Sequence, residues 1–258
     1  MAIHIIQTFM LLLVFCSHGL SAKVLTFERG GASNATGIVD TGSLTFEGGL
    51  IGYSDEFNGQ GGSSLVLGSS LVRYGLFDKF EIRARNAGVI FQDSLVGLND
   101  LGLGFKYAIL NDEHGLLPVI NLTADFRIPV GRSEFRNPGF DHSYKLSMSH
   151  KIAGNFSWFI SMTPSFNSRK NRTGEFSTID LPYVFNLSYA ATERMNLFTN
   201  TYGQWGFSSF SDSPLSQDVG LTYAFTDDFA MDLSFNWGLN ESGPDFGIDC
   251  GFAVRLID

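Results

Sequence analysis

Charged side chains occur within several apolar stretches of this sequence. Basic side chains predominate in the earlier stretches, and acidic ones in the later stretches. The earlier stretches carry mainly basic residues, namely Arg83, Arg85, Lys106, Arg127, Lys145 and Lys151, alongside Glu81 and Asp125. The later stretches carry mainly acidic residues, namely Asp180, Asp218, Asp232 and Asp249, alongside Arg255. Facing each other across an enclosed passage, the two sets would create a transverse field that orients dipolar solutes. Alternatively, charges pair within each set, for example Lys106 with Glu81 or Asp125, and fill the space.

No catalytic constellation accompanies these charges. The histidines after the N-terminal region are His114, His142 and His150, and none has a motif-like neighbour. Cys250 is the only cysteine outside the first 22 residues, so neither an intramolecular disulfide nor a cysteine-based metal site is expected. The sequence therefore predicts no enzyme activity, no metal site and no cofactor.

A period of two organises the stretches that carry the charges. In residues 229–239, large apolar side chains alternate with small or polar ones: Phe229, Met231, Leu233, Phe235, Trp237 and Leu239 against Ala230, Asp232, Ser234, Asn236 and Gly238. A β-strand places these two sets on opposite faces, whereas a helix scatters them around its circumference. The same alternation recurs at 101–110, 118–128 and 246–256, which predicts strands there.

About twelve antiparallel strands are predicted in this way, most of them long enough to cross a bilayer at a tilt. Their ranges are 44–53, 64–74, 79–91, 101–110, 118–128, 143–152, 156–165, 178–189, 195–205, 217–225, 229–239 and 246–257. Short connections (75–78, 111–117, 153–155, 190–194 and 226–228) alternate with mostly longer ones (54–63, 92–100, 129–143, 167–177 and 206–216). Outer-membrane barrels show this pattern, with short periplasmic turns and longer extracellular loops.

The composition also favours a membrane barrel. Charged residues make up 17% of the 258 residues, where about 25% is usual for a soluble domain. The mean hydropathy of +0.07 is too low for a bundle of membrane helices. The alternative is a soluble β-sandwich or lipocalin-like barrel, whose strands also alternate but whose apolar face points inward. The net charge of −9 argues against a nucleic-acid partner.

The sequence divides into three parts. Residues 1–22 are predicted to be a secretory signal peptide, with an apolar run at 5–15 and a small-residue cleavage site at Gly19-Leu20-Ser21-Ala22. Residues 23–43 are rich in Gly, Ala, Ser, Thr and Asn, and are either a flexible N-terminal segment or a plug inside the barrel. Residues 44–258 are predicted to form the outer-membrane barrel.

Four segments, in the same order, resemble an outer-membrane transporter family named for the meta-pathway of phenol degradation (Phenol MetA deg). They are residues 73–83 (RYGLFDKFEIR), 97–107 (GLNDLGLGFKY), 117–118 (LP) and 128–131 (IPVG). The resemblance extends over residues 42–257 and implies a barrel that imports hydrophobic or aromatic compounds. One departure is the C-terminus: many outer-membrane barrels end in Phe, whereas here the last Phe is Phe252, six residues from the end.

These observations together predict an outer-membrane pore for passive uptake of small solutes. The alternative is a non-conducting structural or adhesive barrel that acts through its extracellular loops. The expected partners are outer-membrane lipid, the barrel-assembly machinery, periplasmic chaperones and a small-molecule solute.

Overall fold

The computed structural model describes residues 25, 27–29, 32, 35–55, 62–111, 116–171, 174–206 and 213–257. Fifteen strands form within them: β1 (Leu44–Asp55), β2 (Ser64–Phe77), β3 (Phe80–Asn86), β4 (Val89–Gln92), β5 (Leu95–Leu98), β6 (Leu101–Leu110), β7 (Val119–Ile128), β8 (Asp141–Ala153), β9 (Phe156–Met162), β10 (Ser165–Asn171), β11 (Gly174–Ala190), β12 (Met195–Gly206), β13 (Leu215–Ala224), β14 (Phe229–Gly238) and β15 (Phe246–Ile257). None of the described residues belongs to a helix long and apolar enough to cross a bilayer.

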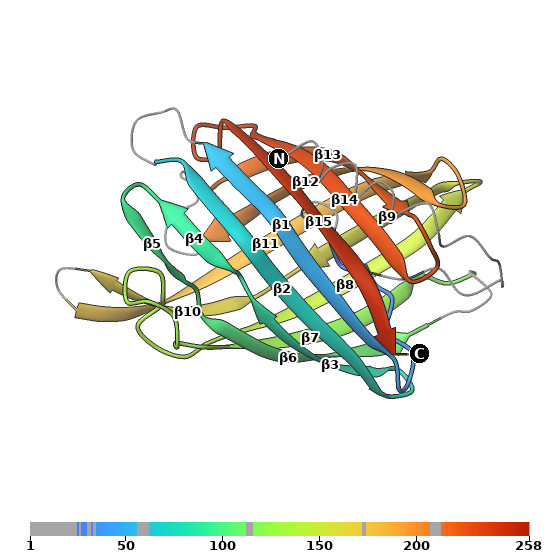
Figure 1. Cartoon of the computed structure of the whole chain (residues 1–258), viewed down its shortest axis with the longest axis horizontal. Coiled ribbons are helices and arrows are strands. Elements are labelled where there is room, and N and C mark those ends of the chain that lie inside the picture. The colour runs from blue at the N-terminus through green and yellow to red at the C-terminus, as the bar shows by residue number, and fades with distance from the viewer. Residues whose placement is uncertain are drawn as a thin grey trace, which may run out of the picture.

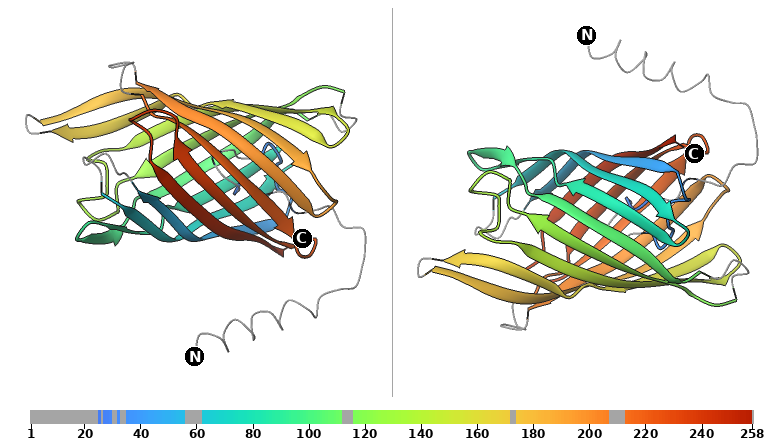
Figure 2. Two further views of the ribbon diagram at one scale, coloured as in Figure 1. Left: turned by 90° about the horizontal axis from the view of Figure 1, so that it is seen from above. Right: turned by 90° about the horizontal axis from the view of Figure 1, so that it is seen from below.

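All of these strands belong to one antiparallel sheet that closes on itself. Strand β1 pairs with β2 on one side and with β15 on the other, and the tilted strands run around a closed barrel (Figures 1 and 2). Closure pairs the backbone groups of the first and last strands, which the interior of a bilayer requires. The predicted all-β, up-and-down antiparallel barrel is confirmed.

Fourteen of the fifteen strands occupy twelve positions around the barrel. Strands β3 and β4 follow one another along β2, interrupted at Gly88, whose φ of 88° breaks the extended backbone. Strands β9 and β10 follow one another along β11 in the same way. Strand β5 pairs only with β4 and adds a hairpin beyond the barrel wall. The predicted count of about twelve barrel strands therefore holds.

Two segments predicted as loops contain strands instead. Residues 92–100 include β5, which Asp93, with a φ of 53°, joins to β4 through a tight turn. Residues 167–177 contain most of β10 and the start of β11, which form a hairpin that extends past the barrel (Figure 1). Strand β10 and the first residues of β11 are largely polar, so they lack the apolar alternation that reveals the other strands.

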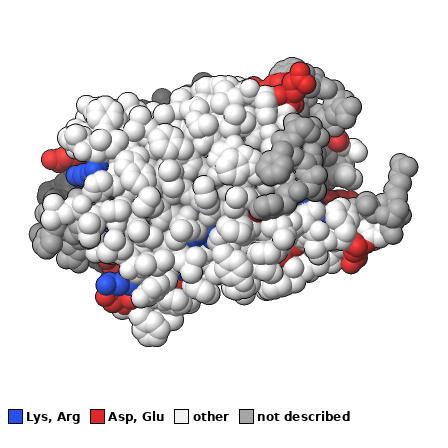
Figure 3. All heavy atoms as spheres, turned by 180° about the vertical axis from the view of Figure 1, so that it is seen from behind, with Lys and Arg blue, Asp and Glu red and all other residues white. Residues whose placement is uncertain are grey.

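The apolar face of the sheet points outward. In β14, Asp232 and Ser234 are 3% and 1% exposed, whereas Phe235 and Trp237 are 40% and 36% exposed. On the face shown in Figure 3, most charged atoms lie towards the two ends, with a broad uncharged surface between them. A soluble sandwich or lipocalin would bury its apolar face, so this arrangement excludes that alternative and fits a lipid-facing exterior.

The two ends of the barrel differ. At one end, called the turn rim here, short connections join the strands, such as 78–79 between β2 and β3 and 154–155 between β8 and β9. Leu44 and Ile257 pair at this rim, so β1 starts and β15 ends there. The opposite end, called the loop rim, carries the longer connections and the two hairpins.

A charge on the outward face should destabilise the barrel strongly. We expect Phe235→Arg to lower the free energy of unfolding by about 2–4 kcal/mol, because Phe235 lies within β14 where lipid surrounds it. The control Leu239→Arg lies just past β14 at the loop rim and should cost about 0–1 kcal/mol. Denaturant titration in lipid vesicles measures both values, and equal costs would contradict the assignment of the outer face.

Candidate functional site

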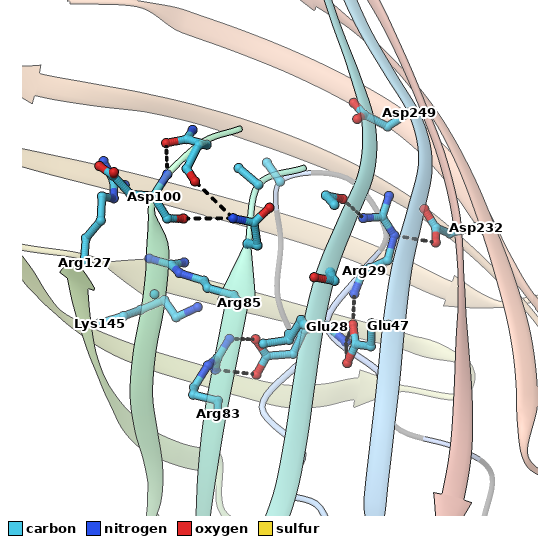
Figure 4. A pocket seen from close by; sticks show the side chains of 18 of the residues that line it. Glu28, Arg29, Glu47, Arg83, Arg85, Asp100, Arg127, Lys145, Asp232 and Asp249 are labelled. Carbon is cyan, nitrogen blue, oxygen red and sulfur yellow. Dashed lines mark hydrogen bonds and ion pairs between the residues drawn. The ribbon is translucent and has the colours of Figure 1, made fainter. Parts of the chain in front are cut away.

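A cavity of about 530 Å³ lies inside the barrel, between side chains of opposite charge. On its basic side are Arg83, Arg85, Arg127 and Lys145, and on its acidic side are Asp218, Asp232 and Asp249. Figure 4 shows the basic side chains on one set of strands and Asp232 and Asp249 on another. The cavity therefore brings together seven of the ten residues that the sequence analysis assigned to two walls.

Strand order explains this separation of charge. The basic residues come from β3, β7 and β8, which β6 joins into one continuous section of the sheet, while the acidic residues come from consecutive β13, β14 and β15. Arg83 and Arg85 are two residues apart, so both point inward. Gly102 and Gly104 of β6 pair with them. A Cβ on Gly102 would lie 2.6 Å from Cγ of Arg85, so the absence of a side chain makes room for the arginine.

The other three predicted wall residues lie elsewhere. Lys106 is 1% exposed and does not line this cavity. Asp180 accepts a hydrogen bond from Asn167 (2.8 Å) at the base of the β10–β11 hairpin. Lys151 is exposed near the turn-rim end of β8, not inside the barrel beside the other basic residues.

The described residues of the N-terminal segment (25, 27–29, 32 and 35–43) contact inward-facing groups of the barrel. The amide of Leu25 donates to the carbonyl of Asp227 at the turn rim (3.2 Å). Further along, the amide of Ala32 donates to Asp218 (2.8 Å), which lines the cavity. The segment therefore reaches from the turn rim to the floor of the cavity.

The same segment returns to the turn rim before β1 starts. The amide of Val39 donates to Glu81 (2.9 Å), and the amide of Gly42 donates to the carbonyl of Gly75 (2.8 Å). The segment passes so close to Gly75 that a Cβ there would lie 2.0 Å from the carbonyl oxygen of Asp40. Only glycine fits this position without moving the segment.

A buried charged cluster, called the Glu28 cluster here, joins this segment to the barrel. It comprises Glu28, Glu47, Arg73, Glu81, Arg83 and Lys106, each at most 6% exposed. Arg83 donates two hydrogen bonds to Glu28 (2.6 and 3.1 Å), and Lys106 donates a third (2.8 Å). Arg73 donates to Glu81 (2.7 Å) and Glu47 (3.2 Å). Charge-assisted and bidentate contacts of this kind are strong, so they anchor the segment at Glu28.

The Glu28 cluster lies between two cavities. Glu28 and Glu47 border the cavity of about 530 Å³. A second cavity of about 290 Å³ lies at the turn rim, where Thr36, Thr41 and Lys79 border it. The N-terminal segment therefore occupies the lumen between a loop-rim cavity and a turn-rim cavity.

The Glu28 carboxylate stays ionised in this setting. Burial alone would raise the pKa of Glu28, but Arg83, Lys106 and Arg73 hold it well below the usual range. A carboxyl group with a lowered pKa keeps its contribution to the stability of the folded state until the pH falls through that lowered value. We therefore expect the Glu28 carboxyl group to stay ionised between about pH 7 and pH 5, which carbon-13 NMR of the labelled carboxyl group would measure. Protonation of Glu28 within this interval would contradict its pairing with Arg83 and Lys106.

Three of the six residues of the Glu28 cluster, Glu28, Glu47 and Arg73, were not predicted from the sequence. Lys106 pairs with Glu28 rather than with Glu81 or Asp125 as suggested, and Glu81 pairs with Arg73. A signal for Glu47 and Arg73 did exist, because each is the only charged residue in its predicted strand, 44–53 or 64–74. The N-terminal segment has no periodicity, so nothing in the sequence placed Glu28.

The segment 73–83 that carries the family resemblance is also a docking surface for the N-terminal segment. Arg73 donates to the carbonyl of Gly37 (2.8 Å), and Gly75, Glu81 and Arg83 make the contacts described above. Its charged and glycine positions therefore have a common structural role.

The histidines do not form a site within the described residues. His142 stacks on Phe166, with ring centroids 4.7 Å apart, in an aromatic group near the loop rim. His150 lies in β8 opposite Trp158, and His114 lies outside the described residues. No group of three or more metal-ligating side chains occurs in the described part of the chain.

Comparisons with known proteins agree with this fold. The barrel is similar to the NanC porin, with a TM-score of 0.58 and 11% identity over 83% of this chain and 100% of that one. It is similar to an outer membrane channel from Pseudomonas putida F1, with a TM-score of 0.63 and 11% identity over 88% and 99%. It is also similar to the KdgM porin, with a TM-score of 0.52 and 9% identity over 82% of this chain and 98% of that one. No curated protein sequence matches the chain. The model of the family described as "Putative MetA-pathway of phenol degradation" matches residues 27–256, so the chain belongs to that family.

Proposed function

We propose that this protein is an outer-membrane channel for passive uptake of small solutes. The observation that carries the proposal is the cavity of about 530 Å³, which the barrel surrounds and charged side chains line. An apolar exterior with a polar lumen is the arrangement of membrane channels built from β-strands. Membership of the family and likeness to porins support the same function.

The proposed solutes are small and include hydrophobic or aromatic compounds, because the family is described by phenol degradation. The cavity has the volume of an ordinary small-ligand site, about 300–1,000 Å³. Interaction with outer-membrane lipid, the barrel-assembly machinery and periplasmic chaperones follows from the proposed location.

Passage along the barrel involves the N-terminal segment. The Glu28 cluster lies between the two cavities, so a solute that moves from one to the other must pass beside this segment or displace it. We propose that the contacts of Glu28 limit conductance in the state described here.

One observation favours the rival function, a non-conducting structural or adhesive barrel. The β10–β11 hairpin extends past the barrel (Figure 1) and exposes Phe176 and Ile179, which are 44% and 45% exposed. Such a hairpin suits contact with another surface, while the Glu28 cluster fills part of the lumen.

Liposome swelling separates the two functions. Proteoliposomes would be tested with a small sugar, an amino acid and an aromatic acid anion, and empty liposomes would serve as the control. A channel should raise the swelling rate, with smaller solutes entering faster. A shift of the protein band on heating in detergent gels would show that the protein is folded. Folded protein that causes no swelling would support the rival function.

A further inference from the structure

The basic side of the 530 Å³ cavity presents guanidinium groups whose acidic partners lie behind them. Arg85 and Arg127 have side chains that are 41% and 42% exposed. Their partners Asp125 and Asp141 are only 10% and 4% exposed, at 3.8 and 3.6 Å. These distances exceed a charge-assisted hydrogen bond, so both arginines keep donors for a further acceptor.

The acidic side presents carboxylates. Asp249 is half-buried on the cavity wall, and one of its oxygens accepts a long bond of 3.4 Å from Asn236. Asp232, behind it, is 3% exposed, and among the described residues its Oδ1 has no hydrogen-bond partner. Arg29 pairs with the other oxygen of Asp232 (3.2 Å). Among the described residues on this side, the carboxylates of Asp218, Asp232 and Asp249 therefore outnumber the one guanidinium group of Arg29. This side therefore keeps a negative charge and acceptor capacity for a cation.

Opposite charges on the two sides restrict the ligand that the cavity prefers. A simple anion is attracted by the arginines but repelled by the aspartates. A simple cation is attracted by the aspartates but repelled by the arginines. An uncharged apolar molecule would leave these charged groups partly desolvated and unpaired, which is costly. A ligand with separated charges satisfies both sides at once.

We infer that this cavity binds a small zwitterion, with its carboxylate against Arg85 and Arg127 and its ammonium group against Asp249. The inference rests on the proposed function and refines it, because among the small solutes proposed above it favours those charged at both ends over purely hydrophobic ones. Asp218 and Asp232 supply the surrounding negative field, and binding requires no covalent step.

Calorimetry on the folded protein in detergent tests this inference with three matched probes. The probes are 4-aminobutanoate, butanoate and butylammonium, which share a carbon chain and differ only in their charged ends. We expect 4-aminobutanoate to bind at least about tenfold more tightly than either single-charge probe, a ratio that corresponds to about 1.4 kcal/mol. Equal affinity of butanoate and 4-aminobutanoate would overturn the inference.

Variants assign the two ends of the ligand. Arg85→Gln with Arg127→Gln should abolish the preference for a carboxylate, and Asp249→Asn should abolish the preference for an ammonium group. Arg85→Lys with Arg127→Lys keeps both charges and should retain most of the preference. Arg194→Gln, at an exposed turn-rim arginine outside the cavity, should bind as the wild type does. Unchanged binding in the Gln and Asn variants would contradict the assigned positions.

The same protein in planar bilayers separates this inference from the proposed function. Conductance without zwitterion preference would overturn the inference and leave the channel function standing. Selective binding without conductance would support the site and contradict the channel.

Discussion

Glu28→Ala combined with Arg29→Ala should raise the single-channel conductance several-fold. Glu28 accepts hydrogen bonds from Arg83 and Lys106, and Arg29 pairs with Asp232, so the double change removes the charged anchors of residues 28 and 29. Released from these contacts, the N-terminal segment would leave more of the lumen to solvent. Arg83 and Lys106 would lose their acidic partner and Asp232 would lose its arginine, so the net charge of the lumen is unchanged and the effect should appear in the conductance.

A matched control is Glu193→Ala, which changes an exposed carboxylate in the turn between β11 and β12. This control should conduct as the wild type does. If the double variant, folded by the gel-shift criterion, has wild-type conductance, the N-terminal segment does not limit passage.

Replacing the two exposed arginines of the cavity should change ion selectivity. Arg85→Ser with Arg127→Ser should raise the permeability ratio of cations to anions several-fold, because fixed charges in a narrow passage act strongly on passing ions. Asp232→Asn with Asp249→Asn should shift the ratio towards anions. Reversal potentials in a salt gradient measure both changes. High salt should weaken them, since the Debye length is about 8 Å at physiological ionic strength.

Arg83 is unsuitable for this experiment, although the sequence analysis placed it with Arg85 in one wall. Its side chain is 4% exposed and its guanidinium binds Glu28, whereas the Arg85 side chain is 41% exposed. Removing one partner of a buried pair costs about 3–5 kcal/mol, because the other charge stays buried. A change of selectivity in the Arg85 and Arg127 variant without loss of folding would distinguish wall charges from structural pairs. Unchanged reversal potentials would contradict the two-wall description.

The barrel was largely predictable from the sequence because the bilayer imposes a strict alternation. Lipid on one side and a polar lumen on the other force residues such as Phe235 and Asp232 onto opposite faces. The β4–β5 and β10–β11 hairpins extend beyond the barrel wall, where that constraint ends, so β5 and β10 lack the strict alternation of the other strands. Gly88 divides one predicted strand into β3 and β4. The alternation of apolar and polar side chains does not reveal this break, because only a single glycine interrupts it.

The site was predictable only in part, for a related reason. Strand parity identified which charges face inward, so the sequence placed Arg85, Arg127 and Asp249 on the correct face of the sheet. Parity does not reveal what fills the lumen, because the N-terminal segment is held by backbone amides and a few charges rather than by a repeating pattern. For this reason Lys106 was assigned partners on its own wall, whereas the structure pairs it with Glu28.

Planar-bilayer recording of the folded wild-type protein, alongside the Glu28→Ala and Arg29→Ala double variant, tests the central claim most directly. A channel predicts discrete conductance steps from the wild type and larger steps from the variant. Silence from both proteins, each confirmed as folded by its heat-dependent shift in detergent gels, would contradict the channel function.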